Sequence, residues 1–292
     1  MRNKSYKRRI AVLAVLLGFL LLLLAFVSAL YVASFTCERS ARVLPSYERK
    51  DVSGLFAKEV WTENDIDVLY HQTGLGEPAL RALKEQTNGA SRLLEYQNAF
   101  FYKGELTHDM AAITTPHDRH ANGYAAPLAP IENGDLVLSS ACHTFGWRNG
   151  HASIVANAKY RSTLESFDPS SASGIGNLGW FLESSNFLVL RLKKEVREEL
   201  GIDPAEVAKA AVENLCGIAY DLTVGVLSPK DQCKDGRTPT KTQCAHIVWQ
   251  AYKNFGLDID SNGGAVVVPR DIARCDYFEV VQVNGFDPDR LW

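Results

Sequence analysis

An almost uninterrupted apolar run from Ile10 to about Val32 constrains this chain more than any other feature. Only one glycine and one serine break it, and about 20 apolar residues are enough to cross a bilayer as a helix. We therefore expect a membrane anchor over residues 10–34, behind a basic cytoplasmic tail at residues 1–9. The alternative is a cleaved signal peptide, although the apolar core of such a peptide is usually only about 7–15 residues long.

The charges around this run predict its orientation. Five basic residues precede it and charges of both signs follow it, and basic residues favour the cytoplasmic side of a membrane. The body after residue 34 is therefore expected outside the membrane, as an anchored or a secreted domain. The whole chain of 292 residues has a net charge of −3, so the part after the basic tail carries −8. Such an acidic body argues against a nucleic-acid partner, because phosphate binding needs a basic surface.

A helix is predicted over residues 242–256, where apolar residues recur with helical spacing and Gly256 supplies a stop. Cys244 falls in its first turn, where unpaired N–H groups and the helix dipole favour a thiolate. It is therefore a candidate nucleophile, and a buried or disulfide-bonded cysteine is the alternative. His246 is excluded as its base, because two residues along a helix rotate a side chain by about 200°.

The histidine best placed to act as the base lies on a predicted β-hairpin. Strand signals at 151–156 and 162–167 flank a turn, and a hairpin that closes near Ala158 makes His151 and Glu165 cross-strand neighbours. A carboxylate beside an imidazole fixes its tautomer and stabilises its charged form, as a general base requires. A surface histidine–glutamate pair is the alternative. The runner-up as base is His143.

Six cysteines in an exported chain could form three disulfides. Cys216 and Cys233 flank a polar loop and are the expected bridge. A nucleophilic Cys244 has to stay unpaired, and Cys37 is then the expected second free thiol.

Neither a metal ion nor a cofactor is expected. The histidines at 117 and 120 have the spacing of half a metal site, but no cysteine or carboxylate cluster lies at ligand spacing beside them, so a solvated loop is expected there. The chain also lacks a dinucleotide-binding glycine fingerprint and a phosphate-binding loop.

The remaining patterns predict an α+β body. Residues 38–60 read as a polar tether with a short helix near 52–60, and residues 65–70 alternate as a strand. Asp203 and Pro204 cap and begin a helix. Further strands are expected at 134–139, 187–192 and 276–283.

Four motifs in this order carry a resemblance: Gly134-Asp-Leu-Val, Gly150-His-Ala-Ser-Ile-Val, Thr163-Leu-Glu and Gln243-Cys-Ala-His-Ile-Val-Trp-Gln-Ala-Tyr. Together they resemble the circularly permuted, YiiX/YaeF-like branch of the NlpC/P60 cysteine hydrolases, a papain-like group in which the histidine strand precedes the cysteine helix. The resemblance covers roughly residues 131–272. It implies a catalytic triad of Cys244, His151 and Glu165.

The resemblance implies a circularly permuted papain-like fold for residues 131–292, an antiparallel sheet packed on helices. Residues 35–130 have no counterpart in the core of that family and are expected as a tether and an N-terminal extension that packs on the core. The resemblance also implies a thiol hydrolase or amidase that acts on an amide or acyl bond, and cell-wall peptide (peptidoglycan) or an acyl-amide is the expected substrate. The predicted substrate contacts are Trp147, Gln243 and Trp249. The alternatives are a non-catalytic surface module that binds wall polymer, and a lipid acyltransferase with the same triad.

Overall fold

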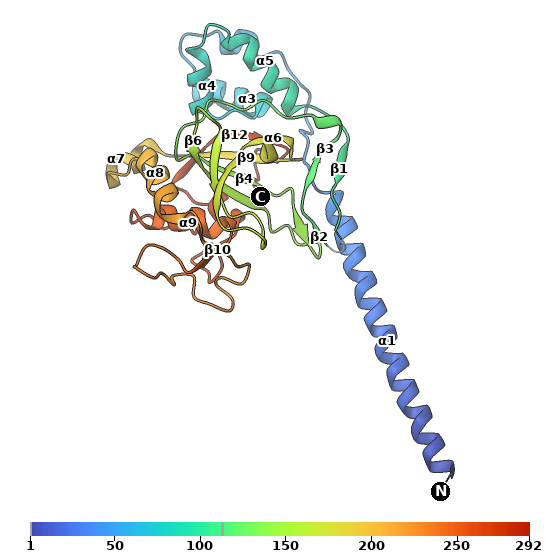
Figure 1. Cartoon of the computed structure of the whole chain (residues 1–292). Coiled ribbons are helices and arrows are strands. Elements are labelled where there is room, and N and C mark those ends of the chain that lie inside the picture. The colour runs from blue at the N-terminus through green and yellow to red at the C-terminus, as the bar shows by residue number, and fades with distance from the viewer. Residues whose placement is uncertain (1, 112–113) are drawn as a thin grey trace.

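The fold is built around a six-stranded antiparallel sheet, seen in the computed structural model of residues 2–111 and 114–292 (Figure 1). The strands lie in the order β12-β9-β4-β6-β7-β8, and every neighbouring pair is antiparallel. With helices on both faces, this is an α+β architecture, as predicted. The strands are β4 (Leu136–Ser139), β6 (His151–Asn157), β7 (Ser162–Glu165), β8 (Gly174–Asn177), β9 (Phe187–Leu192) and β12 (Phe278–Asn284).

Both faces of the sheet are buried, because alternate residues of each strand pack against different helices. Leu136 and Leu138 of β4 share one apolar cluster with α8 (Pro204–Leu215) and α9 (Cys244–Lys253). Val137, between them, belongs to a second cluster with the helices that precede the sheet. Strands covered on both sides read as nearly continuous apolar runs, and this is why the sequence identified β4 and β9.

The segment before residue 131 supplies most of the second helical layer. Its helices pack through Leu69, Leu80 and Leu93 against the sheet face that carries Val137. They are α2 (Ser53–Phe56), α3 (Glu63–Thr73), α4 (Glu77–Lys84) and α5 (Gly89–Phe100), and α6 (Gly179–Glu183) from the β8–β9 connection joins them.

Smaller elements complete the body, among them three two-stranded sheets. These pair β1 (Leu106–His108) with β3 (Asp118–His120), β2 (Thr114–Thr115) with β5 (His143–Thr144), and β10 (Ala219–Tyr220) with β11 (Lys241–Thr242). The short helices are α7 (Lys194–Leu200), α10 (Pro269–Ala273) and a 3-10 turn at Ala121–Gly123.

The strand predicted at 65–70 is wrong, because these residues lie inside α3. The Thr62 hydroxyl accepts the Asp65 N–H at 3.2 Å, and the Asp65 carboxylate accepts the Thr62 N–H at 3.0 Å. Gly74 ends the helix with φ of 70°. Reciprocal caps at the start and a left-handed glycine at the end favour a helix over the strand that the alternating pattern suggested.

The segment 38–60, expected as a tether, is packed onto the body. The carbonyl oxygen of Ala41 accepts hydrogen bonds from Ser185 Oγ at 2.8 Å and Asn186 Nδ2 at 2.6 Å. Val52 is buried, and the helix predicted near it shrinks to the four residues of α2.

A long helix, α1 (Arg2–Glu38), precedes the body and runs away from it (Figure 1). Its segment Arg8–Glu38, of 31 residues, is long and apolar enough to cross a membrane, and no residue of its apolar window is buried in the protein. This observation is consistent with a membrane anchor and with a signal sequence.

Candidate active site

Cys244 is the first residue of α9, as predicted, and its sulfur lies at the start of β6. The thiol Sγ is 3.9 Å from the carbonyl oxygen of Gly150, the residue before β6, and 3.5 Å from Gln243 Oε1. Helix α9 packs on β6. The helix start is therefore held beside the strand that begins with His151.

Gln243 shapes this helix start from the N-cap position. Its Oε1 accepts the Ala245 N–H at 2.8 Å, and its Nε2 donates to the Val267 carbonyl at 2.7 Å. The side chain is buried, and its polar atoms are used within the protein. Gln243, predicted as a substrate contact, thus acts as a structural cap beside the sulfur.

His151 and Glu165 are in contact, which confirms that they are cross-strand neighbours. Ile154 opposes Leu164 in the hairpin, so the same register places Ser153 opposite Glu165 and His151 diagonal to it. His151 Nε2 and Glu165 Oε2 are 2.6 Å apart. A diagonal pair lies within reach of long side chains, and the histidine is thereby oriented by a carboxylate.

Three aromatic rings enclose the His151 imidazole. Phe181 stacks on it, with ring centroids 5.2 Å apart and an angle of 18° between the planes. Phe167 and Trp180 approach edge-on at 4.8 and 5.2 Å. These rings bury the imidazole and fix its plane, so that one ring nitrogen points to Glu165.

The charge state of His151 suits a thiolate partner. Burial lowers its pKa, but the hydrogen bonds with Cys244 and Glu165, together with their negative charges, outweigh burial and raise the pKa to about 9. Because Nε2 contacts Glu165, Nδ1 is the nitrogen left for the sulfur. An imidazolium beside a cysteine stabilises the thiolate, which is the nucleophilic form.

The two tryptophans predicted to contact substrate lie in opposite environments. Trp147 is 59% exposed, in a tight turn before β6. Trp249 is 0% exposed, and its Nε1 donates to Asp258 Oδ1 at 2.8 Å. Five residues after Cys244 the helix has turned by about 140° toward the core. A substrate contact at Trp249 therefore stays a prediction, and the burial of the indole argues against it.

The other candidate histidines are engaged or placed elsewhere. The ring nitrogens of His246, which was excluded as the base, lie 2.9 Å from Thr242 Oγ1 and 2.8 Å from the Lys230 carbonyl oxygen. His143 is buried in β5, and its ring nitrogens have no hydrogen-bond partner in the described part of the chain.

Two groups near Cys244 escaped prediction from the sequence. Burial raises the pKa of the Cys142 thiol, and the charge of Cys244 raises it further. Burial also raises the pKa of Tyr220, and the charges of Cys244 and Cys142 add to this. Both groups keep their protons, so Tyr220 carries a neutral hydroxyl near the sulfur. No spacing rule could reveal them, because they come from the β4–β5 connection and from β10.

The disulfide predicted between Cys216 and Cys233 is wrong, since all six cysteines are free in the residues that the structure describes. Cys216 is exposed at the end of α8, whereas Cys233 Sγ lies 3.6 Å from Gln250 Oε1 on α9. Cys37 is free, as expected.

The solvated loop predicted for His117 is also wrong. This histidine is buried, stacks on Trp180 at 4.4 Å and contacts Ser184 Oγ at 2.9 Å. Across residues 2–111 and 114–292, no group of three or more His, Cys, Asp or Glu side chains could hold a metal ion.

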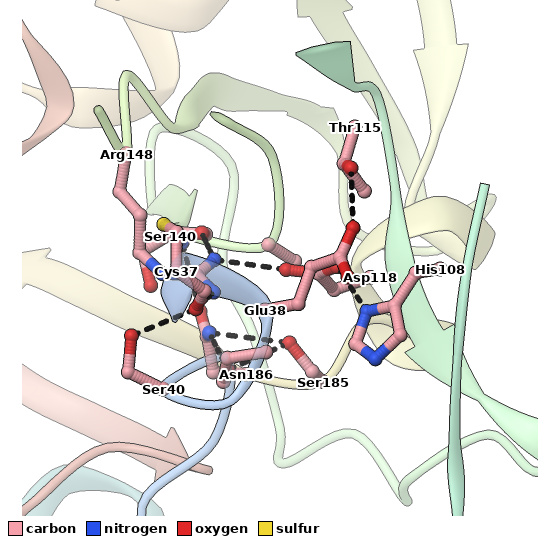
Figure 2. A network of polar contacts seen from close by, with 12 residues as sticks. Cys37, Glu38, Ser40, His108, Thr115, Asp118, Ser140, Arg148, Ser185 and Asn186 are labelled. Carbon is pink, nitrogen blue, oxygen red and sulfur yellow. Dashed lines mark hydrogen bonds and ion pairs between the residues drawn. The ribbon is translucent and has the colours of Figure 1, made fainter. Parts of the chain in front are cut away.

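A network of polar contacts joins the end of α1 to the loop before His151 (Figure 2). Arg148 Nη2 donates to the Cys37 carbonyl at 2.6 Å, and its Nη1 donates to Asp118 Oδ2 at 2.9 Å. Asp118 is fully buried and also contacts His108 Nδ1 at 2.6 Å. The apolar helix and the candidate site thus share one rigid junction.

No family model, no curated protein and no solved structure matches the chain. Its function is therefore inferred from the contacts that Cys244, His151 and Glu165 make.

Proposed function

We propose that this chain is a membrane-anchored, extracytoplasmic cysteine hydrolase with a circularly permuted papain-like fold. The proposal rests on the relative positions of three side chains, those of Cys244, His151 and Glu165. Cys244 begins a helix beside the first residue of β6, and His151 at that position binds Glu165 at 2.6 Å. The histidine strand precedes the cysteine helix in the chain, as the permuted arrangement requires.

Acyl transfer to the Cys244 thiolate would begin the reaction. The sulfur attacks the carbonyl carbon of an amide or ester, and the electron pair of the C=O bond moves to its oxygen. As the tetrahedral intermediate collapses, the bond to the leaving group breaks, and the His151 imidazolium gives its proton to that group. The product is a thioester on Cys244 and a neutral imidazole.

Hydrolysis of the thioester would complete the cycle. His151 removes a proton from water, the hydroxide attacks the acyl carbon, and the sulfur leaves as a thiolate. Glu165 keeps the imidazole in one orientation throughout and stabilises its charged form. The Cys244 N–H at the start of α9 is one donor for the oxyanion.

Compartment and chemistry together suggest the substrate class. A body carried outside the membrane by α1 meets cell-wall peptides and acylated amines, and a cysteine triad cleaves either. Assays with a peptide, an acyl-amide and a phospholipid distinguish these classes.

Alkylation of the full-length protein in detergent by iodoacetamide tests the nucleophile. We expect Cys244 to react fastest, because His151 stabilises its thiolate. Cys216 is the matched control: it is exposed, yet burial of its sulfur raises its pKa, and within residues 2–111 and 114–292 no charged partner lowers it. His151→Ala should slow the labelling of Cys244, and His71→Ala on helix α3, where the histidine contacts Asp67 and Asp289, should not. Faster labelling of Cys216, or equal labelling of Cys244 in both variants, would contradict the proposal.

A further inference from the structure

We propose that the turn of residues 144–147, called here the aromatic turn, lies in the membrane–water interface beside α1. In this position it holds the candidate active site at the bilayer surface. The inference rests on the proposed role of α1 as a membrane anchor, and it adds a second element that contacts lipid.

The aromatic turn is rigid. The backbones of Thr144 and Trp147 exchange two hydrogen bonds of 2.9 Å, and the two central residues, Phe145 and Gly146, have φ of 53° and 77°. Positive φ at both central positions defines a type I′ turn, the tightest form of hairpin connection. The side chains of Phe145 and Trp147 therefore leave the body in fixed directions.

The turn packs directly on α1. A Cβ atom at Gly146 would lie 2.9 Å from the carbonyl carbon and oxygen of Ala33 and 3.0 Å from its Cβ. Only glycine tolerates both this approach and the positive φ. Ala33 lies one residue before the end of the predicted membrane span at 34, so the turn touches the helix at the edge of its apolar segment.

Several large apolar side chains are exposed at this level. Phe145 is 49% exposed and Trp147 is 59% exposed. On the same turns of α1, the side chains of Tyr31, Val32 and Phe35 are exposed too. Large apolar side chains in water are unfavourable, whereas tryptophan and tyrosine are enriched where a membrane span meets the headgroups. The occupant that fits these exposed apolar side chains is the bilayer that surrounds α1.

Arg148 connects the aromatic turn to the candidate active site. This residue follows Trp147 directly, and its guanidinium binds the Cys37 carbonyl at the end of α1 as well as the buried Asp118 (Figure 2). Three residues later the chain reaches His151. Lipid contact at the turn therefore fixes the depth of the catalytic histidine relative to the membrane.

Fluorescence quenching by brominated lipid tests the inference. The full chain is reconstituted in phosphatidylcholine vesicles, with and without bromine near the headgroup end of the acyl chains. We expect bromine to quench the tryptophan fluorescence of the wild-type protein. Most of this quenching should be lost in Trp147→Phe and kept in Trp61→Phe, because Trp61 lies in the helical layer before the sheet and packs on Phe56 at 5.6 Å.

Equal quenching in the Trp147→Phe and Trp61→Phe proteins, or none in the wild type, overturns the inference. The outcome is independent of catalysis, because Cys244→Ala should show the same quenching as the wild type while losing its labelling. Release of the protein from the vesicles by alkaline carbonate would instead show that α1 is not an anchor.

Discussion

A Cβ atom at Gly176 would lie 1.6 Å from Oε1 of Glu165. Gly176 opposes Thr163 in the β7–β8 pair, so its missing side chain leaves the space that the carboxylate fills. Its φ lies outside the left-handed region, and alanine is compatible with a strand there. We expect Gly176→Ala to keep the fold and displace the flexible carboxylate from His151. Labelling of Cys244 should then slow toward the rate of Glu165→Ala, with little change in melting temperature.

The matched control lies two residues away in the same strand. A Cβ at Gly174 would come no closer than 4.0 Å to another atom, the Ala172 carbonyl oxygen. In the Gly174→Ala protein, Cys244 should therefore be labelled at the wild-type rate. If both glycine variants behave alike, the space around Glu165 is not what orients the histidine.

The raised pKa of His151 makes stability depend on pH. The imidazole titrates near 6.5 when unperturbed and near 9 in the folded protein. The folded state therefore binds more protons, and its stabilisation is complete below pH 6.5 and lost as the pH rises to about 9. We expect the melting temperature of the full chain in detergent to fall across this window.

Glu165→Gln should weaken that fall, because the neutral amide no longer holds the charged imidazole. His71 contributes to the pH dependence in both proteins, because hydrogen bonds to Asp289 and Asp67 outweigh burial and raise its pKa as well. The effect of Glu165 is therefore read from the difference between the two proteins. Scanning calorimetry at several pH values measures the difference. Parallel curves for wild type and variant would show that Glu165 does not set the pKa of His151.

Removal of Arg148 should be strongly destabilising. Its partner Asp118 is 0% exposed, and a buried carboxylate that loses its only cation costs about 3–5 kcal/mol. This range is an upper bound here, because His108 still contacts Asp118. Arg148→Gln also leaves the Cys37 carbonyl without this donor. Denaturation of the detergent-solubilised chain measures the loss of stability.

A surface pair nearby gives the comparison. Arg119 and Asp109 contact each other at 3.1 Å with both side chains exposed, and such pairs contribute less than about 1 kcal/mol. Arg119→Gln should therefore change stability little. A similar loss of stability in both arginine variants would mean that the Arg148–Asp118 pair stabilises the fold no more than a surface ion pair does.

The Trp249→Phe variant tests whether the indole stabilises the core or contacts the substrate. The indole is buried and hydrogen-bonded to Asp258, so its loss should cost about 1–3 kcal/mol of stability. Once a substrate is identified, KM should stay unchanged. A raised KM in a protein of wild-type stability would restore Trp249 as a substrate contact.

Local patterns in the sequence predicted five of the six strands of the sheet, all but β8, and the relation between His151 and Glu165. Strand alternation and one turn determine a hairpin register, and the register determines which side chains meet. Cys244 could likewise be placed at a helix start from apolar spacing alone. These features depend on neighbours that are close in the chain.

The failures have physical causes of two kinds. At 65–70, alternating residues suggested a strand, but the cap between Thr62 and Asp65 selected a helix. The bond from Arg148 to Cys37 and the space at Gly176 depend on contacts between distant segments. Pattern analysis detects neither, because no periodicity in the chain encodes them.

The contact between Arg148 and Cys37 also determines how far the body can move from the end of α1. A catalytic body on a flexible stalk explores a volume set by the length of that stalk. Here the chain passes from α1 into the body through hydrogen-bonded residues, without a free spacer. If α1 is a membrane anchor, the body can act only in the zone next to the membrane surface, and the depth of this zone equals the height of the body. Substrates then have to diffuse into this zone or move within the plane of the lipids.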